Sequence, residues 1–168
     1  MRVDLSLVYS HLYFTSKFMF EKRAIHKTYK YFICILSMVL GGTIYLAFRN
    51  TSMLMFSWID SLNLREEIEY IREILFSYKN YLPDFVLYTL PDGCWVFSMT
   101  SFYVLLWGRI KDFQTFFWIS LASFLGLGGE LGQYIGIVEG TFDIMDLIFM
   151  SICAIASYFI CCEKTHQL

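Results

Sequence analysis

The chain has 168 residues, of which 57% are hydrophobic and only 17% are charged, and its formal net charge is −2 at pH 7. An average soluble domain is about 45–50% apolar and about 25% charged, so the composition argues against a soluble protein and favours an integral membrane protein. The slightly negative charge provides no general basic surface, and we therefore exclude nucleic acid as a partner. The length allows a single domain.

The N-terminal segment 1–30 mixes aliphatic and aromatic residues with basic ones, and it predicts a cytoplasmic helix at the membrane interface. The alternative is that its aromatic residues bind another protein. Segment 31–48 has no charged residue and is the first predicted membrane span. The long leader before it and the lack of an A-x-A site after it favour a retained span over a cleaved signal peptide.

The loop 49–83 contains a different kind of helix. Apolar residues recur in it at helical spacing, with arginine and glutamate between them; the apolar positions are Leu64, Ile68, Ile71 and Leu75. We expect an amphipathic helix on the outer side of the membrane. Capping of the bundle is its favoured role, and lying in the membrane interface is the alternative.

Three further apolar stretches approach or exceed the length of about 20 residues that crosses a bilayer. They are 84–107, 113–138 and 142–162, followed by a short tail, 163–168. The predicted fold is therefore all-α and integral to the membrane: a four-transmembrane-helix bundle over 31–162, with the extra amphipathic helix in its first outer loop. Nine lysine and arginine residues fall on one side of this topology and four on the other, so both termini are predicted in the cytoplasm.

Acidic residues interrupt or begin three of these spans: Asp92, Glu130, Asp143 and Asp146. Charged groups at membrane depth are costly and usually face a bundle interior or a water-filled cavity. The predicted topology puts all four in the outer half of the membrane. We therefore expect them to share an intramembrane pocket that faces outward.

The spacing around these acids supports a shared binding site. Glu130 and Gln133 lie on one helix face at i, i+3, and Asp143 and Asp146 form a second such pair. Arg49 ends the first span on the same side of the membrane and is the predicted counter-ion.

Simpler roles stay open for three of the acids. Asp143 is placed to cap a helix, and Asp146 to face interfacial water. Asp92 lies between Pro91 and Gly93, which is also compatible with a broken helix whose free backbone groups it satisfies. Glu130 has no comparable role inside an apolar helix and is the strongest functional candidate.

Three glycines of the third span form two overlapping G-x-x-x-G units: Gly128, Gly132 and Gly136. Small residues at this spacing let helix backbones approach closely. The favoured interpretation is tight packing inside one subunit, and the alternative is the interface of a homo-oligomer.

No motif for metal binding or for catalysis is present. The histidines, His11, His26 and His166, lie outside the spans without ligand spacing, and there is no H-E-x-x-H. No Ser-His or Cys-His constellation is evident. We therefore predict no metal and no cofactor, and we do not favour an enzyme.

The C-terminal half contains Glu130-x-x-Gln133 and then Gly140-Thr141-Phe142-Asp143-x-x-Asp146. In order and spacing this resembles the VanZ-like family of small bacterial membrane proteins over roughly residues 84–160. The loop before Phe142 lacks the arginine that is common in that family. The resemblance implies a protein of the bacterial inner membrane that acts on the cell envelope or its lipids, and a link to antibiotic resistance. It also implies that Asp92, Glu130, Gln133, Asp143 and Asp146 form the site.

Two functional hypotheses follow. The first is an outward-facing acidic pocket that binds a lipid or a cell-envelope group, with membrane lipids as partners. The second is an oligomeric ion channel or membrane effector, such as a toxic or defence pore, whose acidic residues bind or select cations.

Overall fold

The computed structural model of the chain describes residues 5–51, 54–138 and 141–162, with side chains from residue 27 onward except that of Leu54. The described residues form helices and connecting turns, without a strand. The predicted tail 163–168 and the first four residues of the N-terminal segment lie outside the described residues. The elements are α1 (Leu5–Phe48), α2 (Leu54–Ser61), α3 (Arg65–Phe76), a 3₁₀ turn η1 (Lys79–Tyr81), a π-helical turn η2 (Phe85–Thr89), α4 (Leu90–Trp107), α5 (Phe113–Tyr134) and α6 (Ile144–Cys161).

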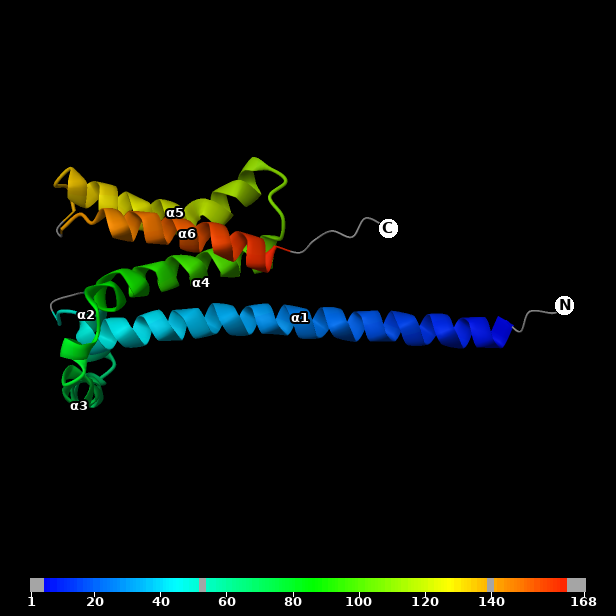
Figure 1. The fold of residues 1–168 in the computed structure, drawn as a ribbon, viewed down its shortest axis with the longest axis horizontal. Coiled ribbons are helices and arrows are strands. Elements are labelled where there is room, and N and C mark those ends of the chain that lie inside the picture. The colour runs from blue at the N-terminus through cyan, green and yellow to red at the C-terminus, as the bar shows by residue number, and fades with distance from the viewer. Residues whose placement is uncertain (1–4, 52–53, 139–140, 163–168) are drawn as a thin grey trace.

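Three helical segments within the described residues are long and apolar enough to cross a membrane: Lys27–Phe48 of α1, α5 and α6. This finding supports an all-helical membrane protein. The central helix is α4, which contacts α1 on one side and both α5 and α6 on the other (Figure 1). The start of α1 at Leu5 and the end of α6 at Cys161 point toward the same end of the structure (Figure 1).

The first helix is one continuous element of 44 residues. The segment 1–30, predicted as an interfacial helix, is helical from Leu5 and runs without a break into the apolar segment. The physical reason is that no proline and no glycine precedes Gly41 in this helix, so nothing interrupts its backbone. At about 1.5 Å per residue, α1 is about 66 Å long, and its first half extends well beyond the other helices (Figure 1).

The contact between α1 and α4 depends on small residues. A Cβ atom added at Gly41 would lie 2.8 Å from Cβ of Cys94 and 3.0 Å from the carbonyl oxygen of Pro91. Next to it, the Ser98 hydroxyl donates to the carbonyl of Cys34 at 2.9 Å, and the Cys34 thiol donates to the carbonyl of Ser98 at 3.2 Å. Close backbones joined by short polar side chains are typical of helix pairs that pack in a membrane.

At the opposite end from α3, a buried lysine joins α1 to α6. Lys30 is 3% exposed, and its Nζ donates to the carbonyl of Cys161 at 3.0 Å. That carbonyl belongs to the last turn of α6, where backbone oxygens lack helical partners and a basic group is favourable. Lys30 therefore caps α6 and fixes it against α1.

The glycines of the predicted third span differ in their surroundings. Gly136 has a φ of +75° and lies beyond the helix, where the amide of Ile137 donates to the carbonyl of Gly132 and the amide of Gly136 to that of Gln133. This is a Schellman motif with glycine at its left-handed position, so α5 ends at Tyr134 and not at residue 138. Gly132 faces Val138 of the same turn, and nothing lies within 4 Å of a Cβ at Gly128. None of these three glycines thus lies within 4 Å of another described helix through an added Cβ.

A π-helical turn precedes α4. The sequence around Asp92, between Pro91 and Gly93, was compatible with a broken helix at this place. Proline removes one backbone donor and clashes with the carbonyl four residues before it. The wider turn η2 comes directly before Pro91, which stands at the start of α4. The helix therefore continues through Asp92 with only a local change in its winding.

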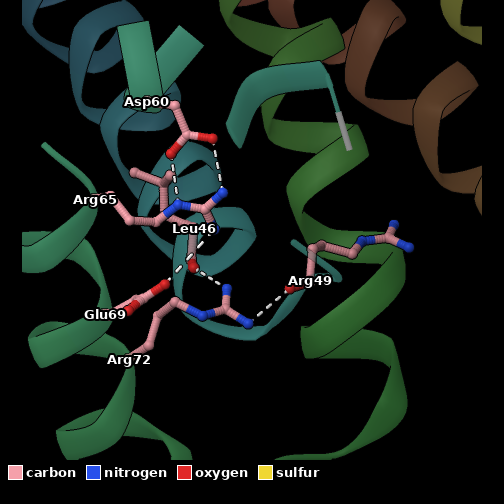
Figure 2. Close-up of polar contacts among 6 residues, drawn as sticks. All are labelled: Leu46, Arg49, Asp60, Arg65, Glu69 and Arg72. Carbon is pink, nitrogen blue, oxygen red and sulfur yellow. Dashed lines mark hydrogen bonds and ion pairs between the residues drawn. The ribbon is translucent and has the colours of Figure 1, made fainter. Parts of the chain in front are cut away.

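Two short helices cover the end of α1. Arg72 of α3 donates to the carbonyls of Leu46 and Arg49, and Arg65 pairs with Asp60 of α2 (Figure 2). The hydrogen bond from Arg65 lowers the pKa of the Asp60 carboxyl. In Figure 1 α3 is drawn nearly end-on while α1 lies in the plane, so α3 crosses the axis of the long helix.

Two neighbouring glycines of α1 give a matched test of this packing. We expect Gly41→Ala to lower the free energy of unfolding in detergent by about 1–3 kcal/mol, because the added methyl group meets rigid atoms of α4. Gly42→Ala meets nothing within 4 Å, so it should be neutral or stabilising by up to about 1 kcal/mol through helix propensity. Thermal unfolding monitored by circular dichroism measures both, and equal effects would contradict the close contact.

Candidate binding pocket

A pocket of about 860 Å³ opens between the end of α1, the η2–α4 segment, α5 and α6. It lies at the end of the molecule where α1 and α5 finish and where α4 and α6 begin. Its floor is apolar and buried, and includes Val96, Ala122 and Met150. Its rim is polar and exposed, and includes Asp84, Thr141 and Asp143. The acids Glu130 and Asp146 are also buried in this pocket, so charged and apolar residues share its interior.

All six residues that the sequence suggested for a binding site line this pocket: Arg49, Asp92, Glu130, Gln133, Asp143 and Asp146. They come from four helical elements that are far apart in the sequence. The three glycines of the G-x-x-x-G units do not line the pocket, whereas the neighbouring Gly126 and Gly129 do.

Arg49 and Asp92 form an ion pair across the pocket wall, with 3.1 Å between Nη2 and Oδ2. The same guanidinium donates to the carbonyl of Tyr88 in the π-helical turn at 3.1 Å, and it lies over the rings of Tyr45 and Tyr88. Its Nε is buried without a hydrogen-bond partner. Arg49 is therefore the counter-ion of Asp92 and also holds the irregular start of the α4 segment.

Glu130 and Asp143 together fix the start of α6. Glu130 is 8% exposed, and one of its carboxylate oxygens accepts a 3.2 Å hydrogen bond from the backbone amide of Asp143. The Asp143 side chain accepts from the amide of Met145 at 2.8 Å, as a helix cap does. The structure thus gives Asp143 the capping role that the sequence left open, and it gives Glu130 a structural partner that the sequence did not reveal.

Asp146 is the acid whose environment is hardest to explain by folding alone. Asp146 is only 8% exposed, so it does not face interfacial water as the sequence allowed. Its Oδ1 is buried without a hydrogen-bond partner. The start of α6 favours a negative charge there, but a buried polar atom without a partner is costly. Because Asp146 lines the pocket, a bound molecule with a hydrogen-bond donor would remove that cost.

Several pocket residues were missed by the sequence analysis: Tyr45, Asp84, Tyr88, Trp95, Met99 and Met150. Helical spacing could have found some of them. Tyr45 lies one turn before Arg49, Tyr88 one turn before Asp92, and Trp95 one turn after it, so each shares a helix face with a residue already suggested. Asp84 gives no such signal, because the irregular turn η2 separates it from α4.

Among the residues that the structure describes, no three His, Cys, Asp or Glu side chains are arranged to hold a metal ion. The pocket acids stand around the cavity and do not converge on one point. No protein-family model, curated protein or solved structure matches the chain. The resemblance to the VanZ-like family therefore stays a prediction.

A double-mutant cycle tests the ion pair. We expect Arg49→Gln and Asp92→Asn each to destabilise the protein, with a coupling of about 1–3 kcal/mol between them, since the two side chains are mostly buried. The pair Arg65–Asp60 is the control, and its coupling should be smaller because it is more exposed. Unfolding free energies of the single and double variants give both couplings, and a zero coupling for Arg49–Asp92 would contradict this geometry.

Proposed function

We propose that the chain is an integral membrane protein whose pocket opens to the outer side and binds a lipid or a cell-envelope group. The observation that carries the proposal is the buried carboxylate of Asp146, which lines a cavity with an apolar floor and has one oxygen without a hydrogen-bond partner. A cavity of about 860 Å³ falls within the usual range of small-molecule sites. Its polar rim and apolar floor fit an amphiphilic molecule.

The proposal includes four membrane spans: the three long apolar segments and, in addition, α4. Its 18 residues correspond to about 27 Å, close to the hydrocarbon thickness of about 30 Å. Much of α4 faces other helices, with polar residues such as Ser98 and Thr100 buried. A helix surrounded by spans needs less apolar surface than one that faces lipid. This explains why α4 is not among the helices that are apolar enough, by composition alone, to cross a membrane.

Exposed aromatic residues support the same membrane position. Tyr29 and Tyr31 flank Lys30, which contacts the end of α6, and Trp107 ends α4; Tyr81 and Tyr134 lie near the opposite end of the bundle. Tyrosine and tryptophan are enriched at membrane–water interfaces. Together with the lysine and arginine count, they support both chain ends in the cytoplasm and the pocket on the outer side. The resemblance to the VanZ-like family extends the proposal to the bacterial inner membrane.

The positions of the two termini distinguish four spans from three. With four spans we expect green fluorescent protein fused to either terminus to fluoresce in cells, because it folds in the cytoplasm. Alkaline phosphatase inserted after Asn80, in the proposed outer loop, should be active. Termini on opposite sides of the membrane would leave three spans and would contradict the proposed topology.

A channel remains the second candidate, and one observation favours it. Gly128 is exposed on α5 with no described atom within 4 Å of an added Cβ, so a helix of a second copy has room to approach it closely. A homo-oligomer formed there would place several acidic pockets in one assembly. Acidic rings are a common means of cation selection.

Native mass spectrometry in mild detergent tests both candidates. We expect the wild-type chain to be a monomer that keeps a bound amphiphile. Ala122→Phe should lower the bound fraction about tenfold or more, because it fills the pocket floor. The control, Ile155→Phe, changes an exposed residue of α6 and should have no effect. A ligand-free symmetric oligomer would instead favour the channel.

A further inference from the structure

The pocket carries an excess of negative charge. Five carboxylates and one guanidinium line it: Asp84, Asp92, Glu130, Asp143, Asp146 and Arg49. The guanidinium is paired with Asp92. No ion pair within the described residues reaches the other four acids. A positively charged group is the natural complement of such a wall.

Burial separates two of these acids from ordinary surface carboxylates. Asp84 and Asp143 are exposed at the rim, and the Asp143 side chain accepts from the amide of Met145. Glu130 and Asp146 are each 8% exposed. Glu130 accepts one backbone amide, whereas Oδ1 of Asp146 has no partner. Among these acids, Asp146 is therefore the one that lines the pocket and has a buried oxygen without a hydrogen-bond partner.

The arrangement of the acids favours an organic cation over a metal ion. Metal ions such as Ca²⁺ take several oxygen ligands at about 2.3–2.6 Å from one point, and no set of three acidic, histidine or cysteine side chains in the described part of the chain meets that need. An ammonium group has three donors that reach acceptors in different directions at longer distances. The cavity, about 860 Å³ in volume, has room for such a group.

The remaining walls suit the rest of an amphiphile. The Arg49 guanidinium lies 5.4 Å from the ring centre of Tyr45 and 5.3 Å from that of Tyr88, so aromatic faces in this pocket already accept a cation. Trp95 also lines the cavity. Below it, Val96, Met99 and Met150 provide an apolar surface that extends into the bundle.

We infer that the pocket binds an amphiphile with an ammonium head, which Asp146 and Glu130 hold, and an apolar chain on the pocket floor. The inference rests on the proposed binding function and specifies its ligand class. The shared chemistry has two sources, an amine-bearing membrane lipid or a soluble cationic amphiphile.

Isothermal titration of the full chain in nanodiscs of uncharged galactolipid tests the inference. The probes are dodecylammonium, dodecyl maltoside and dodecyl sulfate, which differ in head-group charge; the ammonium head carries three N–H donors. We expect dodecylammonium to bind about tenfold or more tightly than the other two. Asp146→Asn and Glu130→Gln should each weaken it by about tenfold or more, since both keep the side-chain shape. The control Glu73→Gln changes an exposed acid of α3 and should have no effect.

The outcomes separate this inference from the function on which it rests. Binding of the maltoside or the sulfate without preference for the cation would overturn the inference and leave the binding function intact. Equal cation binding by wild type and Asp146→Asn, with unchanged thermal unfolding, would also overturn it. If no probe binds and no lipid is retained, both proposals fail. Added phosphatidylethanolamine that competes with the cation would identify a membrane lipid as the source, and a lack of competition would identify a soluble amphiphile.

Discussion

The architecture depends on the need to pair two largely buried charges. Arg49 ends α1 and Asp92 begins α4, and each would be costly alone in an apolar environment. Their ion pair fixes the ends of the two helices against each other. Arg72 of α3 holds the backbone carbonyl of Arg49, while the side chain of Arg49 points away from Arg72 (Figure 2). The short helices outside the bundle thus support one wall of the pocket.

The pocket brings acids with structural roles together with the acid to which we assign a binding role. Glu130 and Asp143 hold the start of α6, and in doing so they keep Asp146 in the first turn of that helix at the pocket wall. A chain that only needed to close the turn after α5 would not require a third acid there. The unpartnered oxygen of Asp146 is therefore the feature that points beyond folding.

The acidic residues and Arg49 could be brought together from the sequence because charge at membrane depth and helical topology restrict their positions strongly. The glycines could not be assigned in the same way. Gly136 fits a packing motif in the sequence, but its role as a left-handed helix end depends on hydrogen bonds that the motif does not specify. The close approach at Gly41 depends on which helix lies opposite, and spacing within one helix carries no such information. The continuity of α1 was missed because a change of composition near residue 30 does not by itself end a helix.

The continuous α1 has a mechanical consequence. Lys30 attaches it to the end of α6, and the contacts at Cys34 and Gly41 hold its Arg49 side against α4. The Leu5 side of Lys30, about 38 Å long at about 1.5 Å per residue, extends beyond the other described helices (Figure 1). This half of α1 is therefore a stiff arm that projects from an anchored bundle.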